Sequence, residues 1–462
     1  MRLSDRDELS FEWAASAIED ALSAWWERVR SVPPSPVVDR AELESSVGEY
    51  RFDKPINLRQ LVGDVVHLLE TSSVHAVHPR YFGLFVPSVH PASVAADALV
   101  AGYNPQVGAW WHSPSANEIE RHTLKYLASC LGIAHMTGQF TSGGNEANHT
   151  TVLAALAHHF PEYIDGGLRS LGSTPVLYAS SESHHSLVKI ARHAGLGAKS
   201  FRTVQVDELY RMRTRELADA IENDLQAGHR PFLVVATLGT TGCGAIDPIA
   251  EIAEICRRHN IWLHVDGAYG ASVCLSPKLR HLVEGVELAD SVTWDAHKWM
   301  SVSMGAGMFF TKHTAALRTA FDVDASYVLE ETAERMDLYQ TSLQWSRRFI
   351  GLKVFMTLAS LGAKRVADDI EWQTQMGVEL RRKLVEAGWT IVNDSPLPVV
   401  CFTHSRFIEH GTDVENFAAR MRDEGNVWIS SLELGGARVL RACITSYRTT
   451  TADLDVLINS LG

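Results

Sequence analysis

The stretch Asp290-Ser-Val-Thr-Trp-Asp-Ala-His-Lys-Trp-Met-Ser301 joins a short apolar segment to a polar turn. Residues 291–294 have the composition of a buried β-strand, and the turn that follows holds Asp295, His297 and Lys298. A second apolar segment begins shortly after the turn. This pattern predicts that Lys298 lies where one strand of a sheet ends.

An acidic residue ends a second predicted strand upstream. The segment Ile261-Trp-Leu-His-Val-Asp266 is mostly apolar, and Asp266 precedes Lys298 by 32 positions (298 − 266). Open α/β sheets bind ligands at the carboxyl ends of their strands, so we expect both side chains at one edge. A lone lysine is usually solvated, but a lysine with a carboxylate suits pyridoxal 5'-phosphate (PLP). The aldehyde of this cofactor bonds to an amine, and a carboxylate keeps its ring nitrogen protonated.

A glycine turn upstream has the features of an anion site. The segment Thr141-Ser-Gly-Gly-Asn-Glu-Ala-Asn148 leads directly into an apolar segment with helical spacing. Unpaired N–H groups and the helix dipole favour a phosphate at a helix amino terminus, and Gly143 and Gly144 would allow its close approach. Most Gly-Gly pairs are only turns, so this indication depends on the neighbouring motifs.

A strand, a helix and a strand follow one another between residues 232 and 265. Asp247 and Pro248 precede the helix, which has apolar residues on one side and Arg257 at its basic end. Such a unit predicts parallel strands joined by a right-handed crossover, which brings Thr241 and Asp266 to the same edge of the sheet. The large part of the chain is therefore expected to have an α/β fold.

The composition limits the classes of partner. The chain has 462 residues, 46% of them hydrophobic, which predicts two or more domains. A net charge of −13 argues against nucleic acids and anionic membranes, so we expect a small-molecule ligand. The six cysteines include no CxxC pair and the histidines no HExxH motif, so neither disulfides nor a metal site is expected. We find no signal peptide or long apolar run and expect a cytoplasmic protein.

The chain divides into three expected parts. Residues 1–72 form a helical arm with predicted helices over 8–30 and near 57–70, residues 73–345 form a large cofactor-binding domain, and residues 346–462 form a small α+β domain. Residues 312–345 have no clean periodicity and many charges, which indicates an active-site loop. The arm helices have apolar faces that need a partner.

Four motifs together resemble a known family: residues 294–299, 264–269, 236–241 and 78–83. They are similar, in the same order, to motifs of the group II PLP-dependent amino-acid decarboxylases, which include aromatic amino-acid and glutamate decarboxylases. The resemblance covers roughly residues 58–450. It implies PLP-dependent transferase fold type I, as in aspartate aminotransferase, with a mostly parallel sheet and a small α+β domain. It also implies a homodimer with the active site at the interface, although the arm could instead pack on its own large domain.

The resemblance also implies roles for individual residues. Cofactor-binding roles go to Lys298, Asp266, Ala268, His185, Gly144, Asn145 and His297, catalytic roles to Lys298, His185, Thr241 and Tyr339, and substrate-binding roles to Tyr81, Phe82 and Trp110. His185 is expected to stack on the cofactor ring opposite Ala268, with His184 as a confusable neighbour. Tyr339 lies one position from the place of the family's proton-donating loop tyrosine, and Tyr327 is the alternative.

The expected reaction is decarboxylation of an L-amino acid to an amine and carbon dioxide. An aromatic substrate is preferred to an acidic one such as aspartate or glutamate. Decarboxylation coupled to oxidation, which gives an aldehyde, is an alternative, as are an aminotransferase and a carbon–carbon lyase on the same fold. A PLP-binding regulator is disfavoured, because no DNA-binding module precedes the large domain. Arg80 and Arg441 could each contact a substrate carboxylate or be structural.

Overall fold

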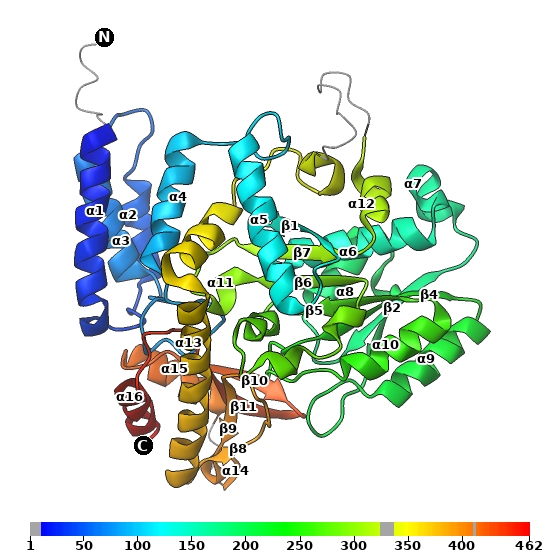
Figure 1. Cartoon of the computed structure of the whole chain (residues 1–462). Helices are drawn as coiled ribbons and strands as arrows, with labels where there is room; N and C mark the ends of the chain where they lie inside the picture. Colours follow the sequence, from blue (N-terminus) through cyan, green and yellow to red (C-terminus); the bar gives the residue numbers. More distant parts are fainter. Residues whose placement is uncertain (1–10, 324–336, 410–412) are drawn as a thin grey trace.

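A computed structural model describes residues 11–323, 337–409 and 413–462. At its centre is a seven-stranded sheet, flanked by helices on both faces (Figure 1). In spatial order its strands are β1 (Thr137–Thr141), β7 (Gly307–Thr311), β6 (Ser291–Asp295), β5 (Trp262–Asp266), β4 (Arg230–Thr237), β2 (Pro175–Ser180) and β3 (Phe201–Val204). Only β7 is antiparallel to its neighbours β1 and β6, and the other pairs are parallel. The expected α/β class with a mostly parallel sheet is confirmed.

Successive side chains of β4 point to opposite faces of the sheet, and helices cover both faces. Leu233 and Val235 pack in one core cluster with α6 (Gly144–His159), α8 (Ser186–His193) and α12 (Thr314–Phe321). Val234 and Ala236 pack in another with α5 (Pro114–Leu131), α9 (Thr214–Gln226) and α10 (Ile249–His259). Because both faces are buried, these strands are continuous apolar runs in the sequence. The short helix α7 (Glu162–Gly166) follows α6.

A second, four-stranded antiparallel sheet lies in the C-terminal part of the chain (Figure 1). Its strand order is β10 (Ser430–Leu434), β11 (Ala437–Cys443), β9 (Val399–Thr403) and β8 (Thr390–Ile391). The helices of this part are α13 (Gly351–Glu386), α14 (Ser405–Glu409), α15 (Val414–Asp423) and α16 (Thr451–Leu461). The sheet, α13, α15 and α16 share an apolar core, as expected for a small α+β unit.

The N-terminal helices stand side by side at one edge of the molecule (Figure 1). They are α1 (Phe11–Arg28), α2 (Arg40–Gly48) and α3 (Leu58–Ser72), and α4 (Pro91–Tyr103) packs along α13. The sequence predicted α1 and α3 but not α2, which is polar and has no apolar face. Among the described residues, no helix is long and apolar enough to cross a membrane.

Candidate active site

Several chain segments end around one cavity of about 270 Å³. They are the turn between β1 and α6, the turn after β2, and the carboxyl ends of β4, β5 and β6. The lining residues are Gly143, Gly144, Asn145, Asn148, His184, Thr237, Gly239, Thr241, Asp266, Ala268, Tyr269, Asp295, His297 and Lys298. The structure therefore brings Lys298 and Asp266 into the same cavity.

Lys298 lies in α11 (Ala296–Trp299), a single turn of helix that continues directly from β6. Its Nζ is 3.4 Å from Oδ2 of Asp295 and 5.9 Å from the centre of the Phe85 ring. Asp295 is buried, and its Oδ1 has no hydrogen-bond partner among the described residues. The amine therefore lies at the cavity with a carboxylate and an aromatic ring beside it.

Asp266, at the end of β5, accepts hydrogen bonds at both carboxylate oxygens. Asn148 Nδ2 donates to its Oδ2 at 2.7 Å, and the Ala268 N–H donates to its Oδ1 at 3.1 Å. The Asn148 amide oxygen in turn accepts from the Thr293 hydroxyl at 2.8 Å and lies 3.0 Å from His264 Nε2. Burial lowers the pKa of His264 to about 4, so its imidazole is neutral at neutral pH. Sequence reasoning identified Asp266 but missed this network.

The amino end of α6 forms the part of the lining that suits an anion. Gly144 and Asn145 are the first residues of this helix, so their N–H groups have no partner within it and the dipole favours negative charge. A Cβ on Gly144 would lie 2.9 Å from Oδ2 of Asp295, so a larger residue there would require the carboxylate or the helix start to move. Nδ1 of His297 accepts the Ala306 N–H at 3.1 Å, and burial lowers the pKa of His297.

His184 rather than His185 lines the cavity after β2. Burial lowers the pKa of His184, and the charges of Asp266 and Lys298 act on it in opposite directions. Its Nδ1 lies 2.7 Å from the Ser186 hydroxyl oxygen, which orients the ring. His185 instead occupies the N-cap position of α8. The expected location of His185 is corrected, because the turn directs only the first histidine of the pair into the cavity.

Comparison with known proteins identifies the family. Residues 44–405 match the family model described as "Pyridoxal-dependent decarboxylase conserved domain". The chain belongs to the pyridoxal-dependent decarboxylases. The resemblance drawn from the sequence motifs is confirmed, and with it PLP as the cofactor and a carboxy-lyase as the class of enzyme.

Curated relatives of this decarboxylase differ in the substrates that their names state. The chain is 28% identical to an aromatic-L-amino-acid decarboxylase from Bacillus atrophaeus, over 92% of this chain and 89% of the relative. It is 30% identical to an acidic amino acid decarboxylase from mouse, over 93% and 80%. It is 26% identical to 4-hydroxyphenylacetaldehyde synthase from Rhodiola rosea, over 98% and 94%. Family membership therefore leaves the substrate open.

Solved structures agree on the fold. The crystal structure of mouse CSAD superposes with a TM-score of 0.91 at 26% identity, covering 98% of each chain. That of the Rhodiola rosea aldehyde synthase gives a TM-score of 0.88 at 25% identity, covering 100% of this chain and 98% of the other. Fold type I, expected from the motifs, is confirmed.

The cavity of the decarboxylase fits the chemical demands of PLP. It offers an amine for the aldehyde, a hydrogen-bonded carboxylate for the ring nitrogen, and a glycine at a helix amino terminus for the phosphate. A Cβ on Gly144 would crowd Asp295 and Ala268, so glycine lets the start of α6 lie close to the cavity wall. In the described parts of the chain, no group of three or more His, Cys, Asp or Glu could hold a metal ion.

Two expected substrate-binding residues lie outside the cavity. Phe82 is fully buried in the core of the small sheet, and its N–H donates to the Trp428 carbonyl at 2.8 Å. The Tyr81 ring packs on the Trp428 ring with centres 5.0 Å apart. These placements are corrections, because the aromatic loop docks on the C-terminal part. Phe85 of the same loop instead approaches Lys298, and the sequence analysis did not single it out.

Trp110 and Tyr339 also lie outside the cavity lining, in a cluster of their own. The N–H of Trp110 donates to the Asp337 carboxylate at 2.7 Å, and that of Tyr339 donates to the Gly108 carbonyl at 3.0 Å. Tyr339 is buried with its ring 4.9 Å from that of Trp345. These contacts hold the two segments together away from the cavity of the single chain, and the roles expected for Trp110 and Tyr339 stay predictions. Tyr327 lies outside the described residues.

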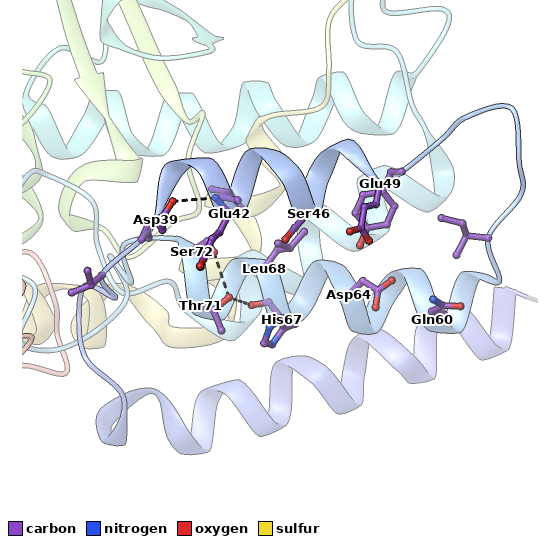
Figure 2. Close-up of a pocket in the computed structure, with 15 residues that line it drawn as sticks. Asp39, Glu42, Ser46, Glu49, Gln60, Asp64, His67, Leu68, Thr71 and Ser72 are labelled. Atoms are coloured by element: carbon purple, nitrogen blue, oxygen red, sulfur yellow. Dashed lines mark hydrogen bonds between the residues drawn. The ribbon is translucent and has the colours of Figure 1, made fainter.

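A larger cavity of about 660 Å³ lies between α2 and α3, in the N-terminal arm (Figure 2). Its lining includes Glu42, Glu49 and Asp64, and none of the 15 lining residues drawn is a lysine or arginine. Such a surface repels a phosphate and offers no amine to an aldehyde. The smaller cavity at Lys298 is therefore the active-site candidate.

Proposed function

We propose that this enzyme decarboxylates an aromatic L-amino acid, giving the corresponding amine and carbon dioxide. The observation that carries the proposal is the single cavity that contains both Lys298 and Asp266, with Phe85 beside the amine. Enzymes in general lower the reaction barrier by roughly 8–23 kcal/mol in total. The residues around the cavity divide that work between holding the cofactor and orienting the substrate.

Five residues would hold PLP. Lys298 would bond to its aldehyde carbon, Asp266 would keep its ring nitrogen protonated, and Gly144, Asn145 and His297 would bind its phosphate. The bound cofactor supplies a ring that accepts the electrons left when the carboxylate departs. Hydrogen bonds from Asn148 and Ala268 hold Asp266 for this task.

Thr241 and His184 would orient the substrate carboxylate. Both line the cavity, and each comes from a turn that follows a strand of the large sheet. Both residues would hold the substrate carboxylate in one orientation, and fixed orientation is among the largest contributions to catalysis. Burial keeps His184 neutral at neutral pH, so it can serve as a hydrogen-bonding group without charge. Ala268 also lines the cavity, where its small side chain would leave room for a ring.

The charges around the cavity favour a neutral aromatic side chain over an acidic one. No arginine is among the described lining residues, and the carboxylate of Asp295 would repel a second acid. Arg441 uses its donors on the carbonyls of Thr241 and Gly83. The Phe85 ring lies 4.1 Å from the Tyr269 ring, centre to centre, and gives an aromatic wall near Lys298.

We also propose that the enzyme is a homodimer formed through the N-terminal arm. Val37, Phe52, Val65 and Leu69 are exposed apolar residues of this arm, and contact with a second subunit would cover them. A cytoplasmic location is proposed as well, because all six cysteines are unpaired thiols.

The substrate proposal is tested with a panel of L-amino acids. Aromatic substrates should give carbon dioxide and amine in equal amounts, without ammonia or peroxide. Lys298→Ala should lose both turnover and the visible absorbance of the bound cofactor. Release of peroxide and ammonia in proportion to carbon dioxide would identify an aldehyde-forming enzyme instead. Turnover of aspartate or glutamate above that of every aromatic substrate would overturn the assigned class.

A further inference from the structure

The turn after β4 carries Thr241 into the cavity and is built to a fixed shape. Gly239 and Gly244 have φ values of +91° and +73°, which favour glycine. The Gly244 N–H donates to the Thr240 carbonyl at 2.8 Å, and the Ala245 N–H donates to the Thr240 hydroxyl at 3.0 Å. These bonds close the turn upon itself. The acceptors of both bonds belong to Thr240, so the backbone carbonyls of residues 241–244 take no part in them.

All four of these consecutive carbonyls accept a hydrogen bond from the C-terminal part of the chain. The donors are Arg441 Nη1 to Thr241 at 2.7 Å, Cys401 Sγ to Gly242 at 3.4 Å, Asn393 Nδ2 to Cys243 at 2.6 Å and Ser395 Oγ to Gly244 at 2.7 Å. We call these four donors the carbonyl clamp. Each is a side chain from β9, β11 or the segment between β8 and β9. The C-terminal part therefore holds each backbone carbonyl from Thr241 to Gly244.

Arg441 is a member of the carbonyl clamp that also bonds to other segments of the chain. Its guanidinium is buried and also donates through Nη2 to the Gly83 carbonyl at 3.4 Å and through Nε to the Ser430 hydroxyl at 3.2 Å. In the described parts of the chain, no carboxylate lies within ion-pair distance of it. Burying a charged group costs free energy. Because the buried Arg441 guanidinium has only neutral acceptors, we infer that its role is to hold these groups in place.

The position of Arg441 connects two parts of the substrate site. Its guanidinium carbon lies 5.9 Å from the centre of the Phe85 ring, the proposed aromatic wall. Its Nη1 meets the carbonyl of Thr241, whose side chain lines the cavity. Because a carbonyl and a side chain share one Cα, fixing the carbonyl also fixes the direction of the side chain. A planar fork can hold two loops at once, which a lysine ammonium cannot do as well.

We propose that Arg441 is a positioning residue that sets the orientation of Thr241 and, through it, of the substrate carboxylate. The inference rests on the proposed role of Thr241 in the decarboxylation. Displacements of about 1 Å in a positioning group can cost on the order of 10²-fold in rate. The cofactor groups Lys298, Asp266 and Gly144 make no contact with Arg441 in the structure, so cofactor binding should be independent of it.

The test compares Arg441→Lys, Arg441→Met and a matched control, Arg422→Met. Arg422 also donates to a backbone carbonyl in the C-terminal part, that of Ile429, but does not touch the turn. Both Arg441 variants should lose roughly 10- to 100-fold in kcat/KM while PLP affinity stays within about twofold. The control should retain wild-type kcat/KM. Wild-type activity in Arg441→Lys would show that charge alone suffices and would overturn the proposal.

A double-mutant cycle separates positioning from a general loss of structure. If Arg441 acts through Thr241, adding Arg441→Lys to Thr241→Val should cost far less than it does in the wild type. Losses that multiply independently would overturn the inference, as would a fall in PLP affinity and melting temperature that parallels the fall in activity. Unchanged activity of Thr241→Val alone would instead refute the role of Thr241 in the proposed function.

Discussion

His184 and His185 are adjacent side chains with different surroundings, and their substitution should have different effects. His184 lines the cavity, whereas His185 occupies a helix N-cap position. We expect His184→Gln to lower kcat/KM on the order of 10²-fold, because it removes a group placed against the substrate. His185→Gln should stay within about twofold. Steady-state kinetics on both variants test this, and a greater loss in His185→Gln would restore the original assignment.

His264 gives this enzyme a predictable dependence of stability on pH. Its folded-state pKa is about 4 against an ordinary value of 6.5, because it is buried. The unfolded chain therefore binds more protons between these values, and stability falls as pH drops from 6.5 to 4. The loss should reach roughly 3 kcal/mol, from 1.36 kcal/mol per pKa unit.

Denaturant unfolding of His264→Gln at pH 4.5 and 7.5 checks this account. The variant should show a smaller difference in unfolding free energy between the two pH values than the wild type. His135→Gln is the control, because His135 is exposed. An unchanged pH dependence in His264→Gln would contradict the assignment of this loss to His264.

The amino end of α6 leads to a specific prediction about binding of the cofactor phosphate. A methyl group on Gly144 would lie 2.9 Å from Oδ2 of Asp295, so Gly144→Ala must displace the helix start or the carboxylate. We expect PLP affinity to fall about tenfold, equivalent to roughly 1.4 kcal/mol. Pyridoxal, which lacks the phosphate, should bind with a smaller change.

A matched glycine is available within another helix of the same chain. A Cβ on Gly63 in α3 would meet no atom within 4 Å, so Gly63→Ala should leave PLP affinity unchanged. Titration of the cofactor-free protein with PLP and with pyridoxal measures both variants. Equal losses for the two ligands in Gly144→Ala would show that the helix start does not bind the phosphate.

Elements near the large sheet could be predicted because local signals and topology agree there. Buried parallel strands are apolar runs, and polar residues that follow them collect at one edge, which placed Lys298, Asp266 and Thr241 near one another. The choice between His184 and His185 could not be made, because a turn has no periodicity that distinguishes neighbours. The Asn148 network could not be predicted either, because an amide within a helix has the same sequence pattern as any other polar residue.

The aromatic loops were the feature of this protein that the sequence predicted least well. Tyr81 and Phe82 pack with Trp428, which lies more than 340 positions away in the sequence (428 − 82 = 346). Only the folded chain shows whether such a loop faces a substrate or joins a second core. The four donors of the carbonyl clamp are also far from the Thr241 turn in the sequence, and no local sequence pattern predicted that they would contact it.

The exposed face of the arm predicts how the molecule associates. Leu69 on α3 is 58% exposed, and Leu225 on α9 is 43% exposed. If the arm forms the dimer, Leu69→Asp should weaken it and yield monomers at micromolar concentration, because a charge would be buried in an apolar contact. Leu225→Asp should remain dimeric. Sedimentation velocity distinguishes these outcomes. A monomeric wild type, or a Leu69→Asp variant that stays dimeric, would contradict dimer formation through the arm.

The cavity draws its walls from residues as far apart as Gly143 and Lys298 and from the ends of β4, β5 and β6. These groups meet only when the strands that carry them are assembled in the sheet, so we expect PLP to bind after the sheet has formed. Its binding energy then adds to the barrier against unfolding and gives no assistance to folding. Refolding should run at the same rate with or without PLP, whereas the finished enzyme should come apart more slowly when the cofactor is present.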